Sequence, residues 1–384
     1  MLDSNSKLDD RAIEIFSLAS ANERISAIVF VNCDNACETR SKIIATGATI
    51  KYDIEILSAF VVDTLAGNLE DLLSIESIEH IAPDVEASTC LDIAKRTIGA
   101  MDTVHQGEGI GVAVLDTGVY LHPDLTTTGN RVVKFVDFIQ GKKTPYDDNG
   151  HGTHCCGIIA GNGEVSNGRF VGIAPRANLV VLKVMNKNGE GRTSDILAGL
   201  DWVWKNRQEF NIKIISISLG APYSAGSFDP LMLACEKLWN NGLVVVAAAG
   251  NEGPEYSTLG SPGISKLVIT VGCSDDHRTV TRVDDTVPSF SSRGPSPFQN
   301  EKPDVIAPGV NIMSLAHDYN GYSAMSGTSM ATPMVSGACA IMLSANPSMT
   351  PNEIKKALIK NAYSLKLSKL EQGSGIIDLG KMIL

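Results

Sequence analysis

The pattern of apolar and polar positions changes character near residue 90. Upstream, the pattern is that of a strand, a helix, a long strand or hairpin, and a second helix, at residues 26–32, 35–46, 48–65 and 68–80. That order of elements predicts a small α+β domain of the ferredoxin-like kind over residues 1–90. The segment after Pro83 has little periodicity, which is typical of an exposed connection where proteolytic cleavage concentrates.

Downstream of this boundary, short apolar strands alternate with turns and helices. Strands are predicted at residues 111–116, 178–184, 212–219, 243–250 and 266–272, and helices at residues 194–207 and 229–241. Continuous runs of Val, Ile and Leu that are separated by helices are typical of a parallel sheet buried on both faces. The sequence therefore predicts an α/β domain over residues 91–384, with a doubly wound, mainly parallel sheet. Its functional residues are expected at the carboxyl ends of the strands.

Composition and charge narrow the range of functions. The 384 residues are 43% hydrophobic, which supplies a sizeable core. The net charge of −11 and the absence of a dense Lys/Arg run argue against a nucleic-acid partner. The apolar runs fall short of the ~20 residues that a membrane helix needs, so we expect no membrane span. An acidic N-terminus unlike a signal peptide, together with eight cysteines in a large chain, predicts a cytoplasmic protein with reduced thiols.

Three short motifs place reactive side chains at strand or helix ends. Asp116 closes a predicted strand before Thr-Gly, where an isolated aspartate usually caps a turn. His151 lies between two glycines, which leave its imidazole uncovered at the start of a helix. Ser329 opens a long apolar helix among small residues, where the helix dipole favours developing negative charge. A metal site at His151 and His154 is an alternative, but the glutamate and third ligand of a zincin-type site are missing.

Taken together, the motifs VAVLDTGV, HGTH and GTSMATP resemble the signatures of the subtilisin-like serine proteases, the subtilases. The resemblance covers residues 91–384 and implies a subtilisin-like catalytic domain. It implies that Ser329 attacks the scissile carbonyl, that His151 transfers the proton, and that Asp116 orients the imidazole, with no cofactor for catalysis. It also implies that residues 1–90 are a propeptide, which in this family folds as a chaperone and inhibitor.

The resemblance further implies an oxyanion hole and a substrate-binding cleft. Asn251 matches the family's oxyanion-hole asparagine, with the backbone N–H of Ser329 as the second donor. The substrate would bind as an extended strand between two flanking segments. The first segment matches Ser218, Leu219 and Gly220, the second matches Gly189, Glu190 and Gly191, and the P1 pocket matches Ala248, Gly250 and Gly260. Glycine at position 260 predicts a deep pocket for large apolar P1 residues, and Glu252 near its rim can also admit Lys or Arg.

Other residues near these motifs also have predicted roles. Asp124 matches a calcium-binding aspartate of many subtilases and is a candidate ligand for a structural calcium ion, although the following loop offers few oxygen side chains. Asp147 and Asp148 either favour basic residues at neighbouring subsites or form a solvated acidic turn. Cys155 resembles the free cysteine that some subtilases carry beneath the catalytic histidine, or else it fills packing space as a small hydrophobe.

The sequence as a whole predicts a serine endopeptidase with broad, apolar-leaning P1 specificity that is made as a self-processing zymogen. Its partners would be protein or peptide substrates and its own propeptide. The alternative is a catalytically silent subtilase-like pseudoprotease that binds peptides or has a regulatory role. The presence of Asp116, His151, Ser329 and Asn251 favours catalysis over that alternative.

Overall fold

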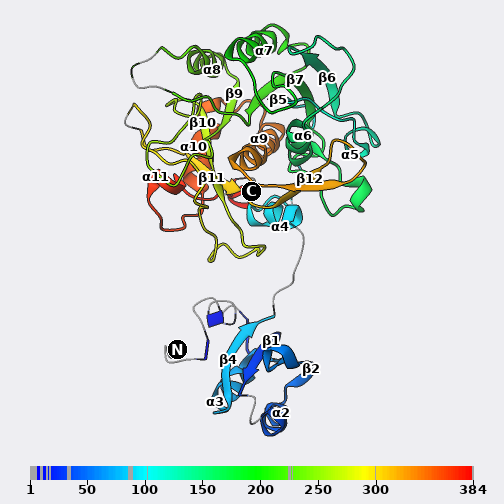
Figure 1. Ribbon diagram of the computed structural model, residues 1–384, viewed down its shortest axis with the longest axis vertical. Coiled ribbons are helices and arrows are strands. Elements are labelled where there is room, and N and C mark those ends of the chain that lie inside the picture. The colour runs from blue at the N-terminus through cyan, green and yellow to red at the C-terminus, as the bar shows by residue number, and fades with distance from the viewer. Residues whose placement is uncertain are drawn as a thin grey trace. The chain divides into compact units, whose positions relative to one another are not determined.

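The chain divides into two compact units, Met1–Ala87 and Ser88–Leu384. A computed structural model describes residues 7–382 except 9–11, 14–15, 17–18, 33–35, 85–89, 102, 224–225, 227 and 299. Figure 1 shows the two units coloured along the chain. Each unit has its own buried core, so each is described by itself.

The first unit is an antiparallel sheet with helices between its strands. Its elements are β1 (Arg24–Val31), α2 (Ala36–Ala45), β2 (Thr49–Ile54), η2 (Glu55–Leu57), β3 (Ala59–Leu65), η3 (Ala66–Asn68), α3 (Leu69–Ser74) and β4 (Ile78–Pro83). The four strands lie in the order β2-β3-β1-β4, which is the split βαβ arrangement of a ferredoxin-like fold. The predicted α+β class of this part of the chain is confirmed.

The expected helix over residues 68–80 is wrong in its second half. Helix α3 ends at Ser74, and the chain continues as strand β4 from Ile78. Apolar residues at 75, 78 and 81 have the three-residue spacing of a helix, but Ile81 pairs with Val29 of β1. Pairing with a strand far away in the sequence satisfies the backbone here, and local spacing cannot reveal it.

The second unit contains a seven-stranded parallel sheet. Its strands lie in the order β11-β10-β9-β8-β5-β7-β6. Their bounds are β5 (Gly111–Asp116), β6 (Val132–Asp137), β7 (Asn178–Lys183), β8 (Ile212–Ile217), β9 (Val244–Ala248), β10 (Ile269–Ser274) and β11 (Val305–Pro308). The predicted strands appear as β5, β7, β8, β9 and β10. Strands β6 and β11 were not predicted, because β6 has two exposed residues in its middle and β11 has only four residues.

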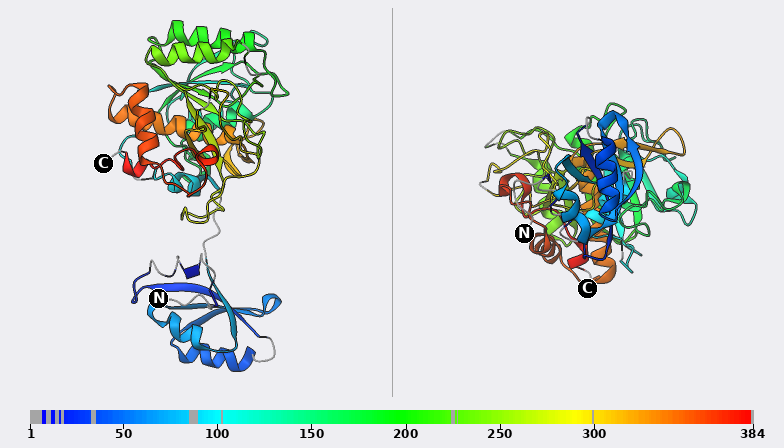
Figure 2. Two further views of the ribbon diagram at one scale, coloured as in Figure 1. Left: turned by 90° about the vertical axis from the view of Figure 1, so that its left-hand side faces the viewer. Right: turned by 90° about the horizontal axis from the view of Figure 1, so that it is seen from below.

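Helices cover both faces of this sheet, as the doubly wound prediction requires. Helices α7 (Thr193–Asn206) and α8 (Pro230–Asn240) pack side by side on one face (Figures 1 and 2). Helices α6 (His151–Ala160) and α9 (Thr328–Ala345) pack together on the other. The remaining elements are α4 (Cys90–Thr97), α5 (Pro123–Thr126), η4 (Glu164–Ser166), a hairpin of β12 (Ile312–Leu315) and β13 (Tyr322–Met325), α10 (Pro351–Asn361), α11 (Lys369–Gln372) and η5 (Leu379–Lys381).

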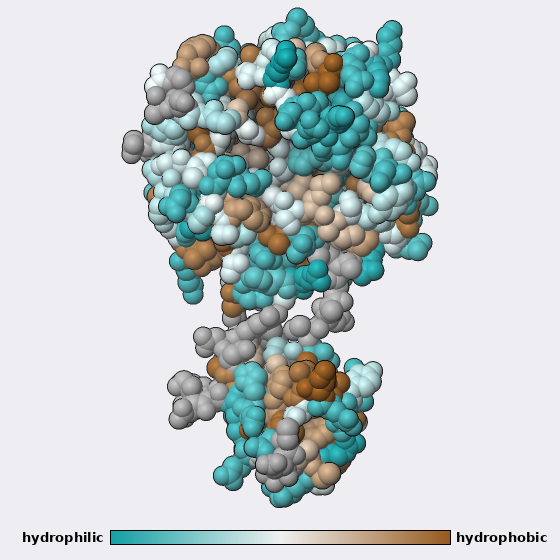
Figure 3. All heavy atoms as spheres, viewed as in Figure 1, coloured by the Kyte–Doolittle hydropathy of each residue, from teal (hydrophilic) through white to brown (hydrophobic). Residues whose placement is uncertain are grey.

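Helix α9 is the apolar centre of the second unit. It is the one helix in the described part of the chain whose length and composition would suffice to cross a membrane. However, 83% of it is buried against the sheet and α6, so its hydrophobic surface is used within the unit. On the face shown in Figure 3, hydrophobic residues form small patches separated by polar ones.

Candidate active site

Asp116 and His151 meet where the first strand of the parallel sheet ends. Asp116 is the last residue of β5 and is fully buried, whereas the His151 side chain at the start of α6 is 24% exposed. Oδ1 of Asp116 lies 2.7 Å from Nδ1 of His151. Gly152 makes this approach feasible, because a Cβ on it would lie only 2.3 Å from the carbonyl oxygen of Gly118.

Ser329 is brought to the same place by helix α9. The Cys155 side chain links the two helices: its Sγ lies 3.9 Å from Nδ1 of His151 and donates to the carbonyl oxygen of Ser329 at 3.5 Å. The Ser329 hydroxyl donates to the carbonyl oxygen of Ser218, just after β8, at 2.9 Å. The three motifs therefore converge on one point, although they lie far apart in the sequence.

The charge of Asp116 governs the protonation of His151. Burial of the ring disfavours the imidazolium, but the adjacent Asp116 carboxylate, together with Cys155, outweighs burial, so the pKa of His151 is raised well above its usual value of 6.5. Because an ionised carboxylate only accepts hydrogen bonds, Nδ1 carries the hydrogen in this contact. Nε2 is then the nitrogen that can accept a proton from another group.

The Asn251 side chain is fixed by the residue that precedes Ser329. Its Oδ1 accepts hydrogen bonds from the backbone N–H of Thr328 at 3.0 Å and from the Thr328 hydroxyl at 3.1 Å. Within the described part of the chain, this arrangement leaves the Nδ2 hydrogens of Asn251 as available donors. Both Asn251 and Ser329 line the same cavity, so an oxyanion formed at Ser329 would meet this amide.

A cavity of about 470 Å³ opens beside Ser329. It is lined by Ser218, Leu219, Gly220, Ala221, Pro222, Tyr223, Ala248, Gly250, Asn251, Glu252, Ser257, Thr258, Leu259, Gly260, Thr328 and Ser329. The predicted segment 218–220 and the predicted P1-pocket residues thus lie together. Sequence reasoning missed Tyr223, Thr258 and Leu259. Their position after the carboxyl ends of β8 and β9 was the available signal.

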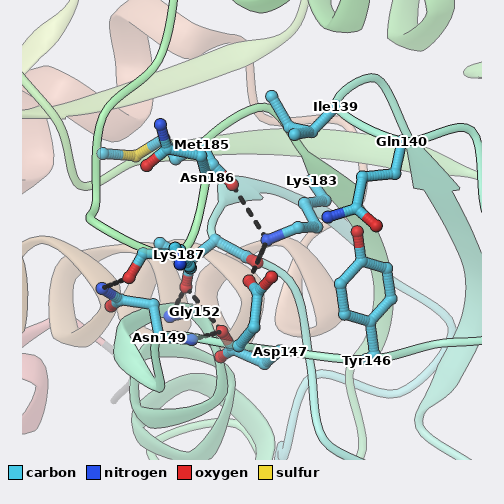
Figure 4. Close-up of polar contacts among 12 residues, drawn as sticks. Ile139, Gln140, Tyr146, Asp147, Asn149, Gly152, Lys183, Met185, Asn186 and Lys187 are labelled. Carbon is cyan, nitrogen blue, oxygen red and sulfur yellow. Dashed lines mark hydrogen bonds and ion pairs between the residues drawn. The ribbon is translucent and has the colours of Figure 1, made fainter.

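The second predicted substrate segment, residues 189–191, borders a different cavity from the one beside Ser329. Glu190 and Gly191 line a separate cavity of about 540 Å³. Asn186 closes their turn, since its N–H donates to the Glu190 carbonyl oxygen at 2.8 Å. The turn is joined to the approach to α6 because Asn149 Nδ2 donates to the carbonyl oxygen of Lys187 at 3.0 Å (Figure 4).

Asp147 organises the start of helix α6 and is not a solvated acid. Its Oδ1 accepts from the Thr117 hydroxyl and from the N–H groups of Asn149 and Gly150. Its Oδ2 accepts from the N–H and the hydroxyl of Thr153 at 2.9 and 2.7 Å. Burial opposes ionisation, but these donors outweigh it and lower the pKa of Asp147. Neither sequence interpretation describes Asp147, because a carboxylate that is saturated internally is unavailable to a substrate.

A buried lysine also contacts the segments around Thr117 and Asp148. Lys183, the last residue of β7, is fully buried and pairs with Asp148 at 2.7 Å, so Asp148 is not a free acidic turn either. Lys183 also donates to the carbonyl oxygens of Thr117 and Met185, and its ammonium lies 5.0 Å from the centre of the Tyr146 ring (Figure 4). Sequence analysis missed Lys183, which ends an otherwise apolar strand.

The surroundings of Asp124 do not fit a calcium ion. Its carboxylate is buried, with Oδ1 accepting from the N–H of Val165 at 2.8 Å and Oδ2 from the Tyr322 hydroxyl at 2.6 Å. A cation requires oxygen ligands around it, and N–H and O–H donors point at this carboxylate instead. The expectation of calcium at Asp124 is therefore not supported by its donor set.

The alternative metal site at His151 and His154 is also not supported. His154 is buried, with Nε2 at 2.9 Å from the carbonyl oxygen of Ile312. This Nε2 is a hydrogen-bond donor and is unavailable to a metal, and among the described residues the groups that gather their ligand atoms around His151 are Asp116 and Cys155, not His154. Burial also lowers the pKa of His154 to about 4, so this histidine is a neutral structural residue.

Comparisons with known proteins agree with this geometry. The model of the subtilase family (Peptidase_S8) matches residues 107–375. The chain is 44% identical over 318 residues to the serine protease AprX of Bacillus subtilis, covering 76% of this chain and 71% of AprX. The chain belongs to the subtilase family. An alkaline protease of Alkalihalobacillus alcalophilus is 32% identical over 341 residues, covering 85% of this chain and 81% of that protease.

Solved structures show the same relationship at the level of the fold. Sphericase matches with a TM-score of 0.64 and 31% identity, covering 76% of this chain and 99% of its own. A cold-adapted subtilisin-like serine proteinase matches with a TM-score of 0.61 and 29% identity, covering 76% and 98%. The subtilisin-like fold predicted from the motifs is confirmed, and this subtilase is a serine endopeptidase.

Proposed function

We propose that this subtilase cuts proteins with broad, apolar-leaning P1 specificity and is made as a self-processing zymogen. The observation that supports catalysis most directly is the 2.7 Å contact between Asp116 and His151, in a site that Ser329 shares. Ser329 Oγ attacks the scissile carbonyl, His151 Nε2 takes its proton and returns it to the leaving amine, and Asp116 stabilises the imidazolium. Asn251 Nδ2 and the N–H of Ser329 stabilise the oxyanion.

The proposed P1 preference follows from the cavity beside Ser329. Leu219, Leu259 and Ala248 contribute apolar walls, and a Cβ on Gly260 would lie 3.3 Å from the carbonyl oxygen of Ala221. Any larger residue at 260 would narrow the cavity, so glycine keeps room for a Phe, Leu or Met side chain. Glu252 lines the same cavity and is exposed, which lets it meet the charged end of a Lys or Arg.

The proposed propeptide is the first unit, residues 1–90 in the sequence. Its separate core supports the view that it folds as an independent module. The proposed cleavage lies between Glu86 and Asp92, a segment that falls largely outside the described residues. Residues 90–92 begin helix α4, and a helix that belongs to a folded unit cannot enter the cleft as an extended strand, so we place the cut before Cys90, in the part of the segment that precedes the helix.

Replacement of the proposed nucleophile tests catalysis and processing together. We expect the Ser329→Ala chain to remain a single species near 40.8 kDa without peptidase activity, while the parent is cleaved between residues 86 and 92. Ser348→Ala, at an exposed serine beyond the other end of α9, is the matched control and should behave like the parent. Intact mass, N-terminal sequencing and hydrolysis of a peptide substrate provide the readouts. Normal processing of Ser329→Ala with no other protease present would refute self-processing.

We also propose that the protein works in a reducing compartment such as the cytoplasm. Cys155, Cys156, Cys235, Cys273 and Cys339 are buried free thiols. Titration of the unfolded, unreduced protein with a thiol reagent should find these side chains as thiols. Disulfides among them would contradict this proposal.

A further inference from the structure

A loop after strand β10 gathers several carboxylates away from the active site. Its ends are joined by hydrogen bonds in both directions between the backbones of Asp275 and Thr286, at 2.8 and 3.1 Å. The acidic side chains of this loop are Asp275, Asp276, Asp284 and Asp285. The loop also contacts α4, because the Thr97 hydroxyl donates to the carbonyl oxygen of Thr279 at 3.3 Å.

Two of these carboxylates are buried without partners for their oxygens. Asp285 is 6% exposed, and neither of its carboxylate oxygens has a hydrogen-bond partner within the described part of the chain. Asp276 is 2% exposed; its Oδ1 accepts from the N–H of Arg278 at 3.0 Å, but its Oδ2 has no such partner. Burial of an ionised carboxylate without a compensating partner is strongly unfavourable.

Two basic groups of the loop, Arg282 and His277, are engaged with other residues. Arg282 donates to the carboxylate of Asp378 at 2.7 Å and to the carbonyl oxygen of Thr97. The His277 ring lies 3.0 Å from the Thr286 hydroxyl through Nε2 and 3.7 Å from Asp275 through Nδ1. Among the described contacts, neither residue pairs with Asp276 or Asp285. Among the described residues, Arg282 and His277 thus offset the negative charge of these two carboxylates only from a distance, without a direct ion pair.

We infer that Asp276 and Asp285 bind a calcium ion that holds this loop together. Calcium prefers hard oxygen ligands, takes six to eight of them and tolerates irregular geometry, so two carboxylates can be completed by loop carbonyls and water. The contrast with Asp124 supports this location, because the oxygens of Asp124 accept N–H and O–H hydrogen bonds whereas those of Asp285 accept none from the residues that the structure describes. A bound cation would cross-link the two halves of the loop and stabilise the catalytic unit.

Calcium binding can be measured directly on the full chain. The Ser329→Ala background prevents autolysis, and after EDTA treatment and its removal the protein is titrated with CaCl₂ in a calorimeter. We expect Asp276→Asn and Asp285→Asn each to lose one bound calcium relative to this parent. Glu209→Gln, which removes the same charge at an exposed position, should retain it. Calcium binding that is absent from the parent, or unchanged in both loop variants, would overturn the inference.

Thermal unfolding distinguishes a cation site from a merely structural role. Without calcium, Asp285→Asn replaces a buried carboxyl group that has no hydrogen-bond partner among the described residues, so its melting temperature should equal or exceed that of the parent. With saturating CaCl₂, the melting temperature of the parent should exceed that of the variant. The ranking of the two melting temperatures should therefore reverse when calcium is added. A variant that is less stable by the same amount in both buffers would show that Asp285 acts through protein contacts alone.

Discussion

The charge around His151 sets the pH range in which this subtilase is expected to work. Its imidazole must be neutral to accept the proton of Ser329, and Asp116 raises its pKa above 6.5 despite the opposing effect of burial. Activity is therefore lost as the pH falls through this raised value. We expect kcat/KM for an uncharged peptide to rise with pH with an apparent pKa above 6.5. Circular dichroism at each pH controls for unfolding, and an apparent pKa below 6.5 would contradict the expectation.

A substitution of Asn251 can distinguish a role of this residue in the transition state from a role in folding. Its Oδ1 is held by Thr328, so its Nδ2 is presented to charge that develops only during the reaction. We expect Asn251→Ala to lower kcat by roughly 10²–10³-fold with little change in KM. Steady-state kinetics and thermal unfolding should be measured on one preparation. A lower melting temperature with unchanged turnover of the folded fraction would indicate a structural residue instead.

Cys155 offers a way to inactivate the site from behind the catalytic histidine. Its Sγ, Asp116 and His151 place their ligand atoms within 4.8 Å of one another, so a small mercurial bound there would displace the imidazole. Burial raises the pKa of Cys155, so iodoacetamide should react slowly. We expect mercurials to inhibit the parent and to spare Cys155→Ala. Full activity with stoichiometric mercury on Cys155, confirmed by mass spectrometry, would show that the thiol only fills space.

At the scale of elements, the start of helix α6 depends on one carboxylate. Asp147 connects Thr117, next to Asp116, with the first turn that carries His151. Asp147→Ala would leave several buried donors without an acceptor, at a cost of about 3 kcal/mol or more in the free energy of unfolding. We expect kcat to fall as well, because His151 loses its fixed position. Urea unfolding and kinetics test this, with exposed Asp318→Ala as the control. Unchanged stability of Asp147→Ala would be the contrary result.

Features that depend on local sequence could be predicted in this chain, whereas features that depend on contacts between distant residues could not. Strand β5 was predicted with its correct bounds because a fully buried parallel strand is an unbroken apolar run. Part of strand β4 was predicted as helix, because the spacing of its apolar residues does not reveal that it pairs with β1. The motifs around Asp116, His151 and Ser329 are local and were found. The contact of Asp147 with Thr117, and those of Lys183 with Thr117 and Asp148, join segments that lie far apart in the sequence and required the structure.

At the scale of the whole molecule, the chain carries two separately folded units whose proposed roles are inhibitor and enzyme. The first has a four-stranded sheet and a core of its own, which supports the expectation that it folds when produced alone. Cleavage at the connection would give this unit a C-terminal tail with the shape of a reaction product. We propose that such a tail would bind the cleft that produced it without offering a bond to cut.

We therefore expect a fragment of residues 1–90 to inhibit the mature protease when added in trans. On the proposed mechanism, inhibition should require both the fold and the tail, because the folded unit would hold the tail in place and the tail would occupy the cleft. Val29→Asp, which places a charge in a fully buried position of β1, supplies an unfolded version, and residues 1–83 supply a folded version without the tail. Both controls should inhibit far less than the intact fragment in a peptide-hydrolysis assay. If the intact fragment has no effect at micromolar concentration, or the unfolded version inhibits equally well, the first unit is not a folded inhibitor.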